Sequence, residues 1–439
     1  MTSTRGNIET AYPLSPLQQG MLFHSLGAPG SGVYVIQVRC EVRGALQIDA
    51  FYQAWQRVLD RHQALRAAFV WEGVDQPMQV IGRRVRLPFH YHDWRGMPES
   101  MQQQRLDRWM ERDRASGFTL SRAPLMRIVL VRLAADRYEI VWTYHHLVCD
   151  GWSRPILLGE FWRCYAAFSA GQQVRLPAPR PYSQYISRLP RDLSQAERFW
   201  RGELGEVTHP TPLGIDRPAI AKVAPSGYGR RDAHLSEPET IGLDGWSRRH
   251  GLSLGTMVAA AWAIVLSRYS HERDVLFGVT VSGRSSSHDG VESLVGLCIN
   301  TLPLRVRVRS AEPMVSWLRT LQAQYAELRE YEHTPLARIQ KWTGVPAGRP
   351  LFESIVVYEN FPTESGIGPR AAAGAELAID NVRGFDKTNY PVTLIASPGR
   401  QFSLAATYDP ARFDEPTIDR LLGHVATVLR RMTAGDEVT

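Results

Sequence analysis

Strand-like and helix-like stretches alternate along both halves of this chain, and the alternation restricts its possible folds more than any other feature. Residues 36–43 alternate strictly between apolar and polar side chains, which is the pattern of a half-buried strand. Residues 254–269 are almost uniformly apolar at a helical length, which indicates a deeply buried helix. We therefore predict an α/β fold with two lobes, at 1–175 and 231–439, joined by a Pro- and Gly-rich connector at 176–230.

The remaining elements follow the same alternation, and no sequence repeat is visible. The stretch 285–290 is predicted to be a mobile loop near the site, and 366–374 a disordered loop. Helices are predicted at about 49–61, 99–115, 153–170, 194–204, 237–250, 314–331 and 415–432. Strands are predicted at about 67–71, 78–81, 125–133, 138–144, 231–235, 273–282, 302–308, 355–359, 389–395 and 402–408.

Composition excludes several classes of protein. With 439 residues, 44% hydrophobic, the chain is long enough for two cores. The net charge of +7 suits an acidic or phosphate-bearing partner, but the arginines are spread along the chain and do not predict nucleic-acid binding. The first ten residues are polar, and no apolar stretch approaches the roughly 20 residues that span a bilayer. Four scattered cysteines (Cys40, Cys149, Cys164 and Cys298) predict buried thiols and a reducing, cytoplasmic location.

The most informative local pattern is a pair of histidines at the end of a predicted β-hairpin. Residues 138–144 are β-branched and aromatic, and they end at His145 and His146. Because side chains alternate along a strand, His146 is expected on the face of Trp142, and His145 on the opposite face with Thr143. The two histidines are therefore expected to have different roles.

Three explanations compete for these histidines and for Asp150, which turns the chain into the next helix. Zinc binding is disfavoured because adjacent strand histidines diverge and no third ligand stands nearby. A purely structural role would make the histidines core residues and Asp150 a helix cap. A catalytic role would use one neutral imidazole as an acid/base at a cleft. These residues alone leave the structural and the catalytic explanations open.

Longer motifs add a family resemblance. The pattern His145-His146-x-x-x-Asp150-Gly151, followed by Trp152 and Ser153, resembles the active-site motif of condensation domains of nonribosomal peptide synthetases, which are relatives of chloramphenicol acetyltransferase. Further stretches follow the order of motifs in that family: Leu14–Phe23, Arg61–Arg66, Ser282–Arg284, Val295–Arg305 and Arg349–Phe352.

The resemblance implies an architecture and a reaction. The family has two chloramphenicol acetyltransferase-like lobes arranged as a V, with a tunnel that donor and acceptor enter from opposite sides. It forms an amide bond when the amine of an aminoacyl group, held on the phosphopantetheine arm of a carrier protein, attacks a donor acyl thioester. No intrinsic cofactor or metal is implied, and the expected partners are a carrier protein and an adenylation domain. The excised chain is expected to be a monomer that binds neither nucleic acid nor membrane.

The resemblance also assigns roles to residues of the motif. His146 is expected to act as the base, or to position the amine, while His145 belongs to the same motif but points into the opposite face. Asp150 is expected to be structural and to pair with Arg284. The backbone N–H of Gly151 is expected to face the developing oxyanion.

Other positions are expected near the substrates. Trp152, Ser153 and Arg154 begin the helix whose neighbours should line the donor side. Asn300 is expected to make a polar contact in the tunnel wall, the alternative being a turn residue at the end of a strand. His62, in the second motif, is expected to be structural.

The donor is expected to be a short-chain acyl-CoA, as in starter condensation domains that acylate the first amino acid. This expectation depends on the short distance between Met1 and the first motif, and on Arg154, whose charge would close an acyl tunnel. An elongation domain that takes a peptidyl-carrier donor is the alternative, and an epimerization domain is a more distant one. A catalytically dead module would be expected to lose His146 or Asp150, and a trimeric acetyltransferase would be about half as long.

Overall fold

The structure is a computed structural model that describes residues 4–217, 228–284, 290–360 and 377–434. The predicted loops at 285–290 and 366–374 lie outside these residues, apart from Gly290. The chain divides into two compact units, each built from three segments. Unit 1 consists of Met1–Leu189, Ser286–Cys298 and Phe361–Thr388, and unit 2 of Pro190–Ser285, Ile299–Asn360 and Asn389–Thr439.

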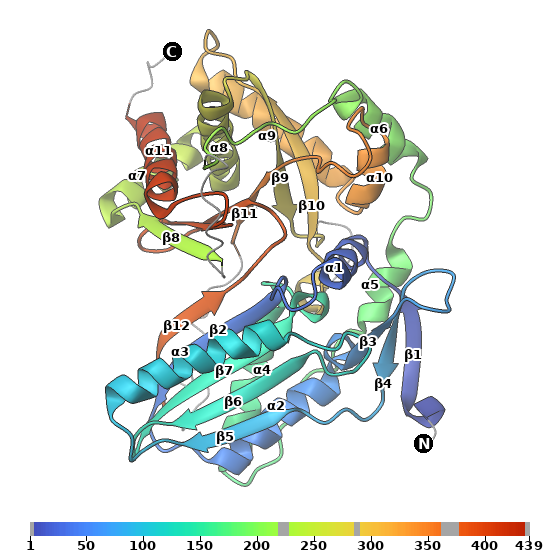
Figure 1. Ribbon diagram of the computed structural model, residues 1–439, viewed down its shortest axis with the longest axis vertical. Coiled ribbons are helices and arrows are strands. Elements are labelled where there is room, and N and C mark those ends of the chain that lie inside the picture. Colours follow the sequence, from blue (N-terminus) through green and yellow to red (C-terminus); the bar gives the residue numbers. More distant parts are fainter. Residues whose placement is uncertain (1–3, 218–227, 285–289, 361–376, 435–439) are drawn as a thin grey trace. The chain divides into compact units, whose positions relative to one another are not determined.

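The main sheet of unit 1 has five strands in the order β12-β2-β7-β6-β5 (Figure 1). The central strands β2 and β7 are antiparallel, with Val35 opposite His145. The edge strand β12 comes from far along the chain and pairs with β2 across a β-bulge. The bounds are β2 Val35–Arg43, β5 Phe89–Asp93, β6 Met126–Arg132, β7 Arg137–His145 and β12 Ala378–Phe385.

Helices cover both faces of this sheet. Helix α3 (Glu99–Ser116) lies on one face (Figure 1), where Leu106 packs among buried valines of β6 and β7. Helices α2 (Ile48–Arg61) and α4 (Ser153–Ser169) lie on the other, where the ring of Trp55 is 5.1 Å from that of Trp142. The alternating side chains of β7 therefore serve two separate layers of core.

A buried charged cluster fastens α2 to α4. Glu160 accepts hydrogen bonds from Arg61 Nε (2.9 Å) and lies 2.8 Å from His62 Nε2. Burial alone would raise the pKa of Glu160, but hydrogen bonds from His62 and Arg61 lower it to about 2. His62 is 4% exposed, as expected of a structural residue.

Smaller elements complete unit 1. Ser15 caps helix α1 (Pro16–Gly27) in a capping box with Gln18, and Pro16 occupies the first helical position, where proline is favoured. A second sheet has the order β1-β4-β3, with β1 Ile8–Pro13, β4 Met78–Gly82 and β3 Ala67–Val70. Helix α5 (Tyr182–Arg188) follows the Pro-rich stretch.

Unit 2 contains a six-stranded sheet in the order β10-β9-β11-β13-β14-β8. Its core is built around α8, where residues 256–263 are all buried, as their uniform hydrophobicity predicts. The strands are β8 Gly229–His234, β9 Asp274–Val281, β10 Asn300–Arg307, β11 Ser354–Tyr358, β13 Val392–Ser397 and β14 Ser403–Tyr408. The helices are α6 Ser194–Leu204, α7 Glu237–His250, α8 Leu254–Ser270, α9 Met314–Glu330, α10 Leu336–Lys341 and α11 Glu415–Thr433.

The α/β class is confirmed, but several elements of the structure were not predicted, and some boundaries differ from the predicted ones. The sequence did not predict β5, β12 or α5, because these are short or mostly polar and carry little hydrophobic periodicity. Helix α2 begins at Ile48 after Gln47, one residue before its predicted start. The passage from unit 1 to unit 2 at 189–190 falls inside the predicted connector, whereas the two later returns of the chain to unit 1 were not expected.

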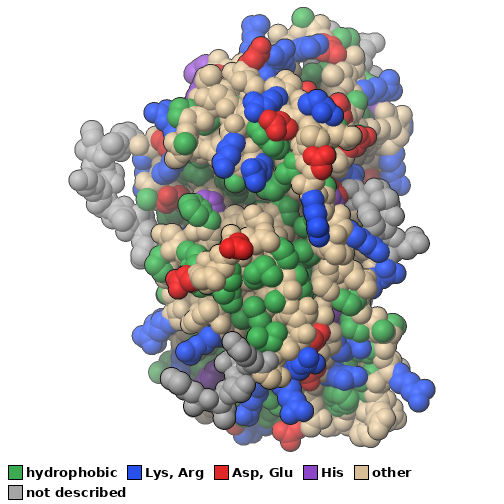
Figure 2. All heavy atoms as spheres, turned by 90° about the vertical axis from the view of Figure 1, so that its right-hand side faces the viewer, with side chains coloured by type: hydrophobic (Ala, Val, Ile, Leu, Met, Phe, Trp, Pro, Cys, Tyr) green, Lys and Arg blue, Asp and Glu red, His purple; other side chains and the backbone are tan. Residues whose placement is uncertain are grey.

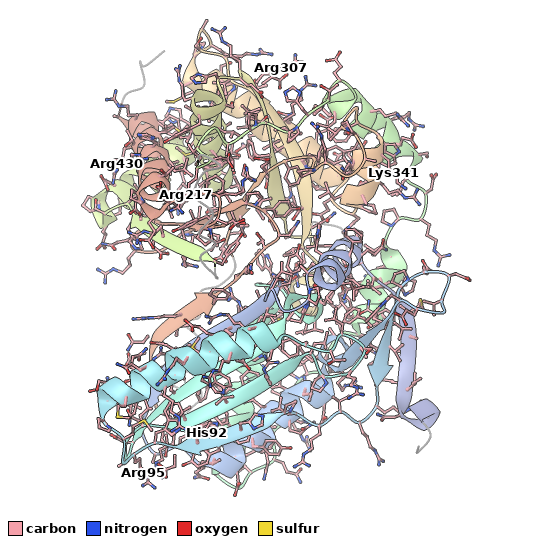
Figure 3. The ribbon with its side chains drawn as sticks, viewed as in Figure 1. His92, Arg95, Arg217, Arg307, Lys341 and Arg430 are labelled. Carbon is pink, nitrogen blue, oxygen red and sulfur yellow. The ribbon has the colours of Figure 1, made fainter. Side chains whose placement is uncertain are left out.

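The basic residues are dispersed, and some of them pair with acids. On the face drawn in Figure 2, Lys and Arg side chains lie in small groups and form no continuous stripe. Arg430 on α11 binds Glu239 at 2.7 Å, and Arg307 on β10 binds Asp274 at 3.2 Å (Figure 3). Within the described ranges, no single helix is long and apolar enough to cross a membrane, and only α7 and α8, bent by 104°, pass that test together by length and composition.

Candidate active site

Strand β7 ends at His145, and His146 begins a short 3₁₀ turn, η3 (His146–Val148). The histidines therefore leave the sheet in different directions, and only His145 is fully buried, at 2% exposure. The prediction that the two side chains have different surroundings agrees with this geometry. Their chemical roles remain predictions.

His145 is held as a neutral ring. The N–H of Leu147 donates to Nδ1 (3.2 Å), so Nε2 carries the hydrogen and donates to Ser25 Oγ, also at 3.2 Å. Burial, with a smaller contribution from the neighbouring His146, lowers the pKa of His145 to about 3. The buried ring of His145 thus links η3 to α1 through these two hydrogen bonds.

His146 is only partly buried, and its ring makes no equivalent contact. Its Nδ1 is buried and has no hydrogen-bond partner in the part of the chain that the structure describes. Its main chain is fixed, because its N–H donates to Tyr34 O (2.8 Å) and its carbonyl accepts from the N–H of Cys149 (3.3 Å). The main chain of His146 is therefore fixed, while its ring nitrogen Nδ1 is hydrogen-bonded to no described residue.

Asp150 organises the turn between η3 and α4 and is completely buried. Its Oδ1 accepts hydrogen bonds from the N–H (3.0 Å) and the hydroxyl (2.8 Å) of Ser153, and its Oδ2 accepts one from the N–H of Cys298 (2.9 Å). Three donors explain how a carboxylate can be buried here, which supports the expected structural role. Ser153, predicted near substrate, is also completely buried.

The segment 294–298 supports this turn from the side, and sequence reasoning gave it no role. The N–H of Gly296 donates to Ser153 Oγ (3.1 Å), while the Tyr182 and Tyr185 hydroxyls donate to the carbonyls of Leu297 (2.5 Å) and Cys298 (3.0 Å). A side chain at Gly296 would run into the Tyr182 ring. The sequence contains both the Val-Gly-Leu-Cys stretch and the two tyrosines, but nothing in it indicates that the tyrosine hydroxyls bind the carbonyls of that stretch.

Gly151, Trp152 and Arg154 surround the beginning of α4. Gly151 and Trp152 form the turn before the helix, and Arg154 lies in its first turn, half-buried. The expected oxyanion contact of the Gly151 N–H and the expected tunnel contacts of Trp152 and Arg154 remain predictions.

Arg284 and Asn300 belong to unit 2. Arg284 Nη1 donates to the nearby Ser282 O (3.4 Å), and the expected ion pair with Asp150 remains a prediction for a double-mutant cycle. The amide of Asn300 donates to Glu332 O (2.8 Å) and Thr334 O (2.9 Å). This geometry suits the turn residue that was the alternative for Asn300, while a substrate contact stays untested.

No metal site accompanies these residues. Among the described His, Cys, Asp and Glu side chains, no group of three or more could hold a metal ion. None of the four cysteines, all of which lie in the described ranges, forms a disulfide, and Cys149, Cys164 and Cys298 are buried.

Known proteins resemble the chain along nearly its whole length. Residues 8–437 match the family described as Condensation domain. One component of the linear gramicidin synthase of Brevibacillus parabrevis is 38% identical over 432 residues, which are 98% of this chain and 6% of the relative. Another component of the same synthase is 41% identical over 428 residues, 96% of this chain and 8% of the relative. The chain therefore spans less than a tenth of these curated relatives.

Solved structures share the fold. A four-domain nonribosomal peptide synthetase bound to AMP and glycine matches with a TM-score of 0.81 and 18% identity, covering 97% of this chain and 33% of that one. The starter condensation domain of rhizomide synthetase matches with a TM-score of 0.77 and 19% identity, covering 98% and 97%. The chain belongs to the condensation domains of nonribosomal peptide synthetases, the acyltransferases that form amide bonds in these assemblies.

Proposed function

We propose that this chain joins a donor acyl thioester to the amine of an aminoacyl group carried on the phosphopantetheine arm of a carrier protein. The observation that carries the proposal is the contrast between its histidines. His145 is locked and neutral, whereas His146 offers a ring whose main chain is fixed and whose Nδ1 is bonded to no described residue. An imidazole held in this way can accept a proton from an attacking amine.

The reaction is a thioester aminolysis. The amine nitrogen attacks the thioester carbonyl, and His146 accepts the proton that the nitrogen loses as the tetrahedral adduct forms. The C–S bond then breaks, the C–N bond remains as the amide, and the proton goes to the departing thiolate. Holding both tethered substrates together can account for several kcal/mol of the barrier. The Gly151 N–H is our candidate donor to the oxyanion.

For the donor, we favour an acyl or peptidyl group on an upstream carrier protein. The chain is 38–41% identical to stretches of three components of linear gramicidin synthase, and 18–21% identical to the solved four-domain synthetase and the rhizomide starter domain. The gramicidin synthase components are each more than ten times as long as the matched stretch, which fits a chain that works beside carrier and adenylation domains.

A short-chain acyl-CoA is the second candidate donor, as expected for a starter domain. The rhizomide starter domain was solved with C8-CoA in a variant whose replaced histidine and arginine are eight positions apart. His146 and Arg154 have the same separation here, and Arg154 is half-buried. This shared spacing is the observation that supports acyl-CoA as the second candidate donor.

The test offers the purified chain an aminoacyl-carrier acceptor with either an acyl-carrier or an acyl-CoA donor, and detects new amide by intact mass. We expect amide from the carrier-bound donor and little from acyl-CoA. His146→Ala should remain folded and lose most of the single-turnover rate, by roughly 10²–10⁴-fold for a lost acid/base group. Near-normal turnover in that variant would overturn the role of His146, and product from acyl-CoA alone would favour a starter domain.

A further inference from the structure

Tyr34 has a backbone conformation that its residue type rarely adopts. Its φ is +60°, and among the described non-glycine residues only His271 and Asn381 also have positive φ. His271 ends α8, and Asn381 lies in the bulge of β12, both ordinary places for such a backbone. Tyr34 instead directly precedes β2 with its side chain buried, at 5% exposure. Bulky residues in this conformation are outliers that persist when their surroundings fix them, often at functional sites.

The local turn makes this choice of residue unfavourable. The N–H of Val35 donates to Gly32 O (3.2 Å), which closes a four-residue turn with Tyr34 in its third position. A positive φ at that position favours glycine or asparagine. Position 34 is occupied by tyrosine and not by glycine, although the backbone there favours glycine. The tyrosine side chain is therefore kept at a cost in backbone strain.

Both main-chain groups of Tyr34 are used, one on each side of the turn. Its carbonyl accepts a hydrogen bond from the N–H of His146, and its own N–H donates to Lys387 O, each at 2.8 Å. Lys387 also donates from Nζ to Ser31 O (2.8 Å), directly before the same turn. All these residues belong to unit 1, and together they hold the turn between His146 and the segment that follows β12.

The ring of Tyr34 packs at the same place. Its centroid is 6.5 Å from that of His145, whose ring is bonded to Leu147 and Ser25. His146, in contrast, has no partner for Nδ1 among the residues described. The ring of His146 is therefore oriented chiefly through its main chain, and the carbonyl of Tyr34 holds that main chain.

We propose that Tyr34 is a positioning residue for His146. The left-handed turn, fixed by the buried ring and by Lys387, holds the main chain of His146 so that its imidazole stays aligned with the attacking amine. Tyr34 acts through His146 and contacts no reacting atom. The inference rests on the proposed function, because it assumes that His146 serves the chemistry.

The experiment measures kcat and KM for the aminoacyl-carrier acceptor with the full chain, at a temperature where circular dichroism shows each variant folded. Tyr34→Gly accepts the positive φ but loses the ring, and we expect kcat to fall roughly tenfold to a hundredfold with little change in KM. Tyr34→Phe keeps the ring and should restore most of kcat. Tyr34→Gly with normal kcat, or Tyr34→Phe as impaired as Tyr34→Gly, would overturn the inference.

Two further variants keep the test decisive. Asn381→Gly removes the side chain from another left-handed residue of unit 1, at the exposed edge of the sheet, and should leave kcat unchanged. If it lowered kcat as much as Tyr34→Gly does, the loss in both variants would come from a general destabilisation of unit 1. If Tyr34→Gly does not fold, Lys387→Met replaces it as the test, because this variant loses the hydrogen bond from Lys387 Nζ to Ser31 O that helps to fix the turn. We expect it to lower kcat without raising KM, and an unchanged kcat would overturn the inference.

His146→Ala in the same assay separates the two proposals. If it is inactive while Tyr34→Gly is fully active, the positioning role alone is wrong. If His146→Ala is fully active, the proposed role of His146 is wrong, and the role of Tyr34 falls with it.

Discussion

At the scale of single residues, the buried His145 makes stability depend on pH. Its folded pKa of about 3 lies below the ordinary value of 6.5, so below pH 6.5 the unfolded chain binds a proton that the folded chain does not. The unfolding free energy should therefore fall as the pH is lowered from about 6.5 towards 3. By pH 5 this amounts to about 2 kcal/mol.

Urea denaturation between pH 7 and 5 checks this. His145→Gln should be less stable at pH 7 but should lose less stability on acidification than the unchanged chain. His234→Gln, which replaces an exposed histidine of β8, is the matched control and should keep the original pH dependence. An equally steep loss in His145→Gln would show that the titration belongs to other groups.

A second prediction at this scale concerns Arg154 and the length of the acyl chain that the donor carries. If its half-buried side chain closes an acyl tunnel, Arg154→Ala opens apolar volume, and each added buried methylene gains up to about 0.8 kcal/mol. The variant should then shift from short towards medium acyl chains in competition with mixed donors, while Arg163→Ala, further along the same helix, should not. An unchanged product distribution would remove Arg154 from donor selection.

At the scale of elements, the contact between α5 and the segment 294–298 stabilises the turn after η3. Gly296 has a φ of +153° and lies against the Tyr182 ring, so a β-carbon there would be strained and would displace a ring that is 1% exposed. We expect Gly296→Ala to lower the unfolding free energy by about 1–3 kcal/mol. The rate of condensation should fall too, because Cys298 would no longer hold Asp150 in place.

The control is a glycine with open space around it. Gly242 lies inside α7 with nothing near its missing side chain, so Gly242→Ala should stabilise the chain by up to about 1 kcal/mol and leave the rate unchanged. Thermal unfolding and single-turnover rates measure both variants. If the two variants had the same stability and the same rate, the packing of Gly296 against Tyr182 would contribute neither to folding nor to condensation.

At the scale of the whole molecule, unit 1 is assembled from three separate segments. A fragment of residues 1–189 would lack β12, which covers the edge of β2, and the segment that binds Asp150. An exposed, unpaired edge strand promotes association. We expect this fragment to aggregate or to remain partly folded in size-exclusion chromatography and circular dichroism, in contrast to the full chain. A folded, monomeric fragment would show that the later segments are dispensable for unit 1.

The sequence by itself determined the α/β class, most helices and strands, the hairpin that ends at His145 and His146, and the motifs of the family. Each of these depends on neighbours along the chain, through side-chain periodicity, capping at Ser15 or turn residues, so local patterns suffice.

Only the tertiary structure decided which partners those residues have. Most of these contacts join residues a hundred or more positions apart. They include the pairing of β12 with β2, the hydrogen bond from Cys298 to Asp150, and the contacts of Tyr34 with His146 and Lys387. The hydrogen bond from Ser153 to Asp150 is local by comparison. Such contacts leave no periodic signal, because they satisfy individual buried polar groups and main-chain atoms that any residue type supplies.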